Sequence, residues 1–452
     1  MKIPATPPDH IALLSRLGKD PAKARALATV LSTTQSGPLD PWEKVRFRPP
    51  EPPLSPAEMW AALKLARLGA RRTLSFEDKQ GRPFHFTERS DFARALHEID
   101  SNARGFVGMP AAAASAATPK DRDVYLRRSL IEEPFSSSLL EGAATTREIA
   151  RKMIEDGREP KTVGERMVLN NYRAMAFIRE HGGEPLTPAR ILDLHRILTE
   201  ETLERPEMVG VLRRTGDDVR VVESVTGDTL HIPPDARALS QRLERLCDFA
   251  NAPSSGKDGF LHPVIHAIVL HFMLAYDHPF WDGNGRCARA LFYWCVLRHG
   301  YWLLEYVSIS AVIRRAPTRY GMAFLHSEID EGDLGYFVEH QLGVVERALA
   351  DLRKYLDAKA AERGTLARAM GALETRLNPR QWTFVQEALK RPGAAYGIAG
   401  HAERFSVSYL TARADLEDLW KLKLLRKTRK GVQSVYLVPK DLRARLERRA
   451  DG

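Results

Sequence analysis

A stretch of twelve residues, HPFWDGNGRCAR at positions 278–289, combines residue types that bind phosphate groups. Two glycines flank Asn284 and predict a tight loop whose backbone amides are unobstructed. A helix is expected to begin near Arg286 or Cys287, so that Arg286 and Arg289 lie one turn apart. Loop amides, an open helix N-terminus and two guanidinium groups together predict an anion site suited to a polyphosphate.

Two other side chains of this stretch add metal and proton-transfer chemistry. Asp282 stands at the rim of the loop, and a carboxylate beside bound phosphates is the usual way to hold Mg²⁺. His278 follows an apolar helix that is expected to stop there, because Pro279 disfavours helical backbone at the preceding residue. An imidazole with an ordinary pKa of about 6.5 can take a proton from an incoming hydroxyl near neutral pH. The stretch therefore predicts nucleotide-dependent group transfer.

The same twelve residues resemble the signature of the Fic family, HxFx(D/E)GNGRxxR, at every fixed position. The resemblance extends from about Asp121 to about Leu349. It implies an all-α, Fic-type helical core with a β-hairpin flap. It also implies a protein AMP-transferase that uses ATP and Mg²⁺ to move AMP onto a Ser, Thr or Tyr hydroxyl of a target protein or of itself, releasing pyrophosphate.

The resemblance assigns roles by position. It implies that His278 is the base that deprotonates the target hydroxyl and that Asp282 holds Mg²⁺ between the α- and β-phosphates. Phe280 is implied to bury its ring and so to fix the loop.

The remaining signature residues are implied to bind the nucleotide. Asn284, with the amides of Gly283 and Gly285, would orient the α- and β-phosphates. Arg286 and Arg289 would bind the outer phosphates.

A second motif lies upstream, where residues 135–142 (FSSSLLEG) predict the end of a helix with Gly142 as its cap. Glu141 there is disfavoured by the helix dipole and calls for a nearby cation. Ser137 and Glu141 match the (S/T)xxxE(G/N) inhibitory motif of one class of Fic proteins. This resemblance implies that Glu141 pairs with Arg289 and takes the place of the γ-phosphate, so that the chain is autoinhibited.

The elements that position these residues divide the 452-residue chain into three parts. Residues 1–120 are expected to be an N-terminal extension and linker, with a helix from Pro56, a strand at 83–87 and an alanine-rich linker at 110–120. Residues 121–363 form the predicted core. Residues 377–452 form a predicted winged helix-turn-helix, with helices at 379–390 and 408–424 and with wing strands at 425–428 and 434–438 around a turn at 430–431. Apolar periodicity predicts core helices at 163–180, 188–203, 237–249, 263–276 and 287–299. Two short strands within Val219–Ile232 predict the hairpin, which resembles the family's flap.

Charge is concentrated near the C-terminus. The whole chain carries 68 Lys and Arg against 58 Asp and Glu, a net charge of +10. Between Arg413 and Asp451, twelve basic residues oppose six acidic ones. A basic helix-plus-wing unit is typical of DNA binding, although a protein-binding module has the same shape.

Other features restrict the class of protein. The three cysteines form no CxxC pair, which argues against a disulfide framework or a structural zinc site and favours a reducing compartment. Prolines and charges interrupt the first twenty residues where a signal would be apolar, and no apolar run reaches the length of a membrane span. We therefore expect a cytoplasmic protein without a membrane partner, and a homodimer is one assembly compatible with this.

Two other classes of function stay open at this point. The first is a different reaction at the same site, either removal of AMP or another nucleotidyl or phosphoryl transfer. The second is a DNA-binding regulator whose core senses a nucleotide. A metal enzyme built on His262, His266 and His271 is a more distant alternative, since no matching carboxylate accompanies these histidines.

Overall fold

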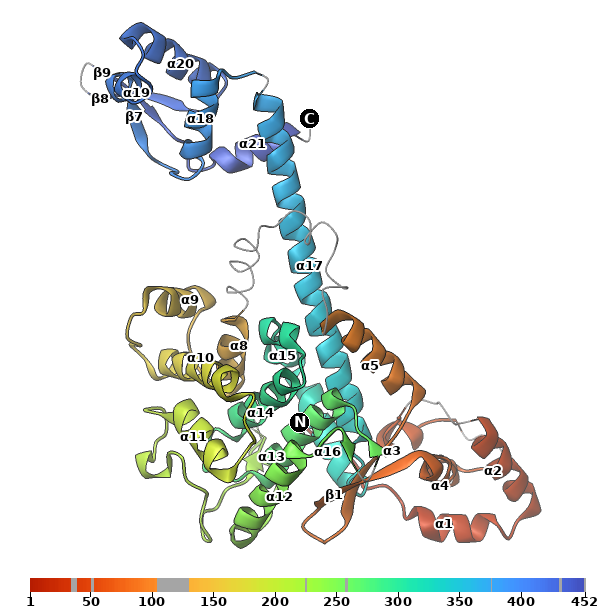
Figure 1. Cartoon of the computed structure of the whole chain (residues 1–452). Coiled ribbons are helices and arrows are strands. Elements are labelled where there is room, and N and C mark those ends of the chain that lie inside the picture. Colours follow the sequence, from red (N-terminus) through yellow and green to blue (C-terminus); the bar gives the residue numbers. More distant parts are fainter. Residues whose placement is uncertain are drawn as a thin grey trace. The chain divides into compact units, whose positions relative to one another are not determined.

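The computed structural model is mainly helical and divides into two compact units (Figure 1). It describes residues 1–33, 39–49, 53–103, 130–223, 226–256, 259–374, 376–430 and 433–450. The first unit contains the described residues up to Leu352, and the second those from Arg353 onward. The alanine-rich linker expected at 110–120 and the glycine of the wing turn at 431 lie outside the described residues.

The N-terminal region belongs to the same unit as the core. Its elements are α1 (His10–Leu17), α2 (Pro21–Thr33), α3 (Trp42–Val45), α4 (Pro56–Arg67), the hairpin strands β1 (Arg71–Glu77) and β2 (Pro83–Thr87), and α5 (Ser90–Ala103). The predicted start of α4 is confirmed, because Ser55 caps the helix in a capping box with Glu58. The predicted strand at 83–87 is also confirmed, and His85 bridges it to the core at Asp333.

The core consists of helices around a central antiparallel pair. Its helices are α8 (Glu132–Leu140), α9 (Arg147–Asp156), α10 (Val163–His181), α11 (Pro188–Thr199), α12 (Leu239–Asn251), α13 (Pro263–Asp277), α14 (Asn284–Arg298), α15 (Ile309–Ile313), α16 (Pro317–Ile329) and α17 (Gly335–Glu374). Helices α13 and α14 pack against each other and are buried on nearly all faces (Figure 1). A helix that is apolar all round belongs in the interior of a large core, which accounts for the long apolar runs.

The hairpin predicted within Val219–Ile232 is present as β3 (Val221–Val222) and β4 (Thr229–His231), paired antiparallel. It does not stand alone, because Lys79 Nζ donates to the carbonyl of Ile232 at 3.1 Å. A second short pair, β5 (Ser255–Gly256) and β6 (Gly259–Phe260), precedes α13.

The second unit has its own hydrophobic core. It contains α18 (Pro379–Ala388), β7 (Ala395–Gly397), α19 (Ile398–Phe405), α20 (Tyr409–Lys421), β8 (Arg426–Lys430), β9 (Gln433–Leu437) and α21 (Leu442–Ala450). The three strands form one antiparallel sheet in the order β7-β9-β8. The sequence predicted α18, α20 and the two wing strands but missed β7 and α19. Both lie in the short segment between the two predicted helices, to which the sequence analysis assigned no element, and α19 buries Ile398 and His401.

Candidate active site

The turn between α13 and α14 holds His278 in an unusual conformation. His278 caps α13 with φ 46° and ψ 57°, a left-handed backbone that costs a non-glycine residue about 1–2 kcal/mol. Its Nδ1 donates to the carbonyl of Ala275 at 3.2 Å, which leaves Nε2 as the acceptor. Burial lowers the pKa of His278 to about 4, so the ring is neutral at neutral pH. The expectation of an unshifted pKa is therefore wrong.

Asn284 holds the loop that follows. Its Oδ1 accepts from the amide of Phe280, and its Nδ2 donates to the carbonyl of the same residue, both at 2.9 Å. The Phe280 ring is fully buried, as expected, and stacks on His195 with centroids 3.7 Å apart. Because both ends of the side-chain amide of Asn284 bind backbone, this side chain holds the loop in this structure, and the backbone N–H of Asn284 is one of those at the start of α14 that have no partner within the helix.

The second helix begins earlier than predicted. Gly283 takes φ 86° and caps α14, so Asn284 and Gly285 lie in its first turn and the prediction of a start at Arg286 or Cys287 is wrong. A Cβ on Gly283 would lie 2.8 Å from Thr199 Cγ2, so only glycine fits there. A Cβ on Gly285 would collide with the carboxylate of Glu141, which lies against this residue. An acidic group thus already occupies the N-terminus of α14.

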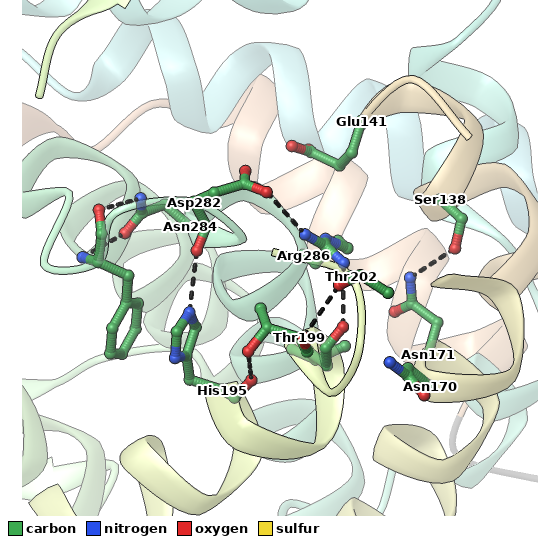
Figure 2. A network of polar contacts seen from close by, with 12 residues as sticks. Ser138, Glu141, Asn170, Asn171, His195, Thr199, Thr202, Asp282, Asn284 and Arg286 are labelled. Atoms are coloured by element: carbon green, nitrogen blue, oxygen red, sulfur yellow. Dashed lines mark hydrogen bonds and ion pairs between the residues drawn. The ribbon is translucent and has the colours of Figure 1, made fainter. Parts of the chain in front are cut away.

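Arg286 is almost wholly buried and bound within the protein. It is 1% exposed, and it donates to the carbonyl of Leu198 at 2.9 Å and to Asp282 Oδ2 at 3.2 Å (Figure 2). The side chain of Asp282 is 52% exposed. This contact therefore leaves the second carboxylate oxygen of Asp282 available at the rim of the site.

Arg289 pairs with the upstream motif, as the sequence predicted. Its Nη2 donates to Glu141 Oε1 at 2.8 Å, and its Nε donates to Ser137 Oγ at 3.0 Å. Burial alone would raise the pKa of Glu141, but the positive charges of Arg289 and Arg286 outweigh it and lower that pKa below its ordinary value. Glu141 is therefore ionised and ion-paired at neutral pH.

Helix α8, which carries Glu141 at its C-terminal end, is fastened to the core. Glu133 in its first turn accepts hydrogen bonds from the Oγ atoms of Ser308 and Ser310 at 2.7 and 2.6 Å. Near its other end, Ser138 accepts from Asn171 Nδ2 at 2.9 Å (Figure 2). These contacts fix the axis of α8 and so direct Glu141 to the first turn of α14.

A polar cavity of about 300 Å³ opens over this arrangement. Three sets of residues line it: Glu141 from the end of α8, residues 218–220 ahead of β3, and the turn residues His278, Trp281, Asp282, Asn284 and Gly285. The cavity thus brings together the predicted base, the predicted metal carboxylate, two of the predicted phosphate-binding positions and the predicted inhibitory carboxylate.

Sequence reasoning missed two residues that hold the site. His195 Nε2 donates to the carbonyl of Asp282 at 2.9 Å, and its Nδ1 accepts from the amide of Gly210 at 3.0 Å. Arg213 Nε donates to the carbonyl of His278 at 2.8 Å. Both residues lie more than sixty positions before the signature, so the spacing of residues within the signature could not indicate them. A histidine on the apolar face of α11 was the one available hint.

The alternative metal site on three histidines is not assembled. His262, His266 and His271 bond to different partners, namely Asp100, the carbonyl of Phe249 and the Tyr320 hydroxyl. Within the described ranges, no group of three or more His, Cys, Asp or Glu side chains is arranged to hold a metal ion.

Residues 185–296, which contain most of this site, match a family model described as the Fic/DOC family. These residues form a domain of the Fic/DOC family. Helices α8, α9 and α10 of the core precede the matched residues, and α15 to α17 follow them. Among the helices that the structure describes, none is both long enough and apolar enough to cross a bilayer.

Known Fic proteins resemble the chain over about half of its length. It is 27% identical over 232 residues to the protein adenylyltransferase Fic of Culex quinquefasciatus and 28% identical over 227 residues to that of Drosophila grimshawi. These matches cover 51% and 48% of this chain but only 42% and 43% of the relatives, so the chain spans somewhat under half the length of these two curated relatives. The crystal structure of a Fic family protein from Desulfovibrio desulfuricans superposes with a TM-score of 0.52 and 19% identity, covering 78% of this chain and 97% of that one. That likeness concerns the fold.

Proposed function

We propose that the chain is a protein AMP-transferase that is autoinhibited by Glu141. The observation that carries the proposal is the position of the Glu141 carboxylate, which lies on Gly285 at the N-terminus of α14 and pairs with Arg289. Helix N-termini with adjacent arginines bind phosphate groups, and here a protein carboxylate stands in for one. The resemblance to enzymes named protein adenylyltransferase supports AMP as the transferred group.

In the proposed reaction, Nε2 of His278 takes the proton of a Ser, Thr or Tyr hydroxyl on the target. The hydroxyl oxygen then forms a bond to the α-phosphorus of ATP, and the bond from that phosphorus to the bridging oxygen breaks, so that pyrophosphate leaves. A pKa of about 4 makes His278 a weak base in the closed site. Phosphate charges in the cavity would raise that pKa toward neutrality, because a nearby anion favours imidazolium.

The residues present fit a magnesium ion bound together with ATP. Asp282 offers one carboxylate oxygen at the cavity rim, and Mg²⁺ typically takes one or two carboxylates and completes its shell with phosphate oxygens and water. When bound, the ion would neutralise charge on the phosphates and on the departing pyrophosphate. This chain supplies the amides of α14 and, once Glu141 withdraws, the guanidinium group of Arg289.

In this proposal, autoinhibition arises because Glu141 and an outer phosphate of ATP compete for the guanidinium group of Arg289. While Glu141 pairs with Arg289, an outer phosphate of ATP meets a carboxylate in place of a guanidinium group. Like charges at that distance repel, so ATP would sit displaced from the geometry needed for in-line attack. Withdrawing the carboxylate would free both Arg289 and the first turn of α14.

The test compares the wild-type protein, Glu141→Gly and His278→Ala. Each is incubated with Mg²⁺, cell lysate and ATP labelled on either the α- or the γ-phosphate. We expect protein labelling from the α-phosphate only, strongest in Glu141→Gly and absent in His278→Ala. Labelling from the γ-phosphate would show phosphoryl transfer instead. Loss of AMP from a pre-labelled target, dependent on Glu141, would favour the removal reaction.

A second function is proposed for the C-terminal unit, which we infer to be a winged helix that binds DNA. Among the basic residues of strand β8, Arg426 and Arg429 are exposed and Lys427 is ion-paired with Glu417 at 3.1 Å. The first turn of α20 exposes Tyr409 and Leu410, which are 57% and 75% accessible. An exposed helix end beside a basic two-stranded wing matches the shape and charge that duplex DNA requires.

DNA binding is tested with the full chain and a labelled duplex at increasing salt concentration. We expect binding that weakens steeply with salt and that is reduced in Arg426→Gln/Arg429→Gln. The matched control Arg151→Gln removes an exposed arginine of α9 and should bind like the wild type. Absence of binding at low salt would leave a protein-binding module as the better assignment. A cytoplasmic location and a homodimer stay predictions, and the mass of the chain in solution tests the latter.

A further inference from the structure

We propose that Arg213 and His231 are positioning residues that fasten the flap to the turn carrying His278, so that flap and base move as one body. The inference rests on the proposed transfer reaction, in which His278 would deprotonate the target, and on the resemblance of the hairpin within Val219–Ile232 to the family's flap, which implies that this hairpin holds the target segment. The inference starts from the four consecutive carbonyl groups of residues 276–279 at the end of α13, which accept no hydrogen bond within the helix.

Arg213 pairs with three of these carbonyl groups. Its Nε donates to His278 O at 2.8 Å, its Nη2 to Asp277 O at 3.3 Å, and its backbone amide to Pro279 O at 2.9 Å. The residue is 7% exposed. A buried guanidinium group directed at carbonyl oxygens of one turn determines where that turn lies, because its donors have fixed directions.

His231 pairs with the carbonyl just before these. Its Nε2 lies 2.7 Å from Tyr276 O, and its Nδ1 lies 2.7 Å from Glu328 Oε2 on α16. His231 belongs to β4 of the flap, and the same guanidinium group of Arg213 also donates to the carbonyl of Pro234, three residues further on. The C-terminal end of the flap is therefore bonded to the turn at two points, through His231 at the end of β4 and through the carbonyl of Pro234 just after it.

The consequence is a fixed distance between the flap and the base. His278 adopts a left-handed backbone that the turn alone would not favour, and Arg213 binds its carbonyl directly. A target segment held by the flap would thus be placed relative to Nε2 of His278 through these two side chains. Neither side chain lines the cavity as the structure describes it, so nucleotide binding should depend on them much less than transfer does.

Arg242 provides a matched control. It is also an arginine beside the end of α13, and its side chain is 12% exposed. It binds the carboxylate of Asp277 at 2.6 Å and the carbonyl of Glu77 at 2.8 Å, but not the carbonyls of the turn. Replacing it by lysine removes comparable contacts without releasing the backbone at His278.

The experiment introduces Arg213→Lys or Arg242→Lys into Glu141→Gly and measures AMP transfer together with ATP affinity by calorimetry. We expect Arg213→Lys to lower kcat about tenfold to hundredfold while the Kd for ATP changes by less than about threefold. Arg242→Lys should keep kcat within about threefold of its parent. Equal kcat in the two lysine variants, or parallel loss of kcat and ATP affinity in Arg213→Lys, would overturn the proposal.

A second readout separates this inference from the proposed function. In histidine-labelled protein with Glu141 intact, the ring resonances of His278 should shift in Arg213→Lys and stay in place in Arg242→Lys. An unchanged His278 signal in Arg213→Lys overturns the positioning role whatever the enzyme transfers. If Arg213→Lys does not fold by circular dichroism, His231→Gln replaces it in both measurements with the same expected result. An inactive Glu141→Gly parent with the His278 shift present would reject the transfer reaction alone.

Discussion

Acidification is expected to destabilise the core through His195, whose ring must remain neutral in the folded protein. Its Nε2 donates to the carbonyl of Asp282, and its Nδ1 accepts from the amide of Gly210. Protonation of Nδ1 would place its N–H against the N–H of Gly210, so the hydrogen bond between these two groups would be lost. Burial is the main cause that lowers the pKa of His195 to about 4, and the nearby charge of Arg286 lowers it further.

The size of the effect follows from proton linkage. An unfolded histidine has a pKa of about 6.5, so between that value and about 4 the unfolded chain binds a proton that the folded chain does not. Stability is therefore lost as the pH falls through this window. For His195, which is fully buried, the loss between pH 7 and pH 5 amounts to about 2 kcal/mol in the free energy of unfolding.

The assay is urea unfolding of the wild type and His195→Gln at pH 7 and pH 5. Glutamine can donate to Asp282 and accept from Gly210 but cannot titrate, so the variant should lose about 2 kcal/mol less than the wild type on acidification. Other buried histidines titrate equally in both proteins and cancel. His97→Gln removes an exposed histidine and should keep the wild-type pH dependence. Equal losses in the wild type and His195→Gln would refute the argument.

Three further predictions concern stability and reactivity. Asn284→Ala removes both bonds to the Phe280 backbone and should lower the free energy of unfolding by about 2 kcal/mol; no change in the urea midpoint would contradict this role. Lys64→Met strands the buried carboxylate of Asp330, 2.9 Å away, and should cost about 3–5 kcal/mol, with Lys64→Met/Asp330→Leu recovering much of it; an additive double variant would argue against the pair. Cys287 is fully buried and its pKa is raised to about 12, so N-ethylmaleimide at pH 7 should label it only after unfolding, as peptide mass mapping would show; rapid labelling of the native protein at this residue would contradict its burial.

Local chemistry made several elements predictable from the sequence. Ser55 ahead of Pro56 marks a helix start, because a hydroxyl can cap the free amides and proline needs no donor there. His278 before Pro279 marks a helix end. The start of α14 was placed two or three residues late, because Gly283 alone makes the turn and Asn284 uses its side chain to close the loop.

Residues 278–289 by themselves gave the resemblance to the Fic signature and pointed to the proposed chemistry, because proton transfer and phosphate binding need such groups within one turn and one helix start. Only the tertiary structure decided what surrounds them. The resemblance to the inhibitory motif implied that Glu141 meets Arg289 across 148 positions of sequence, but nothing in the sequence indicated that His195 reaches Asp282 across 87. Such contacts depend on how α8 and α11 pack against α14, and packing is a property of the whole core that local spacing does not encode. The same holds for Arg213, whose hydrogen bonds join two segments that are close only in the folded chain.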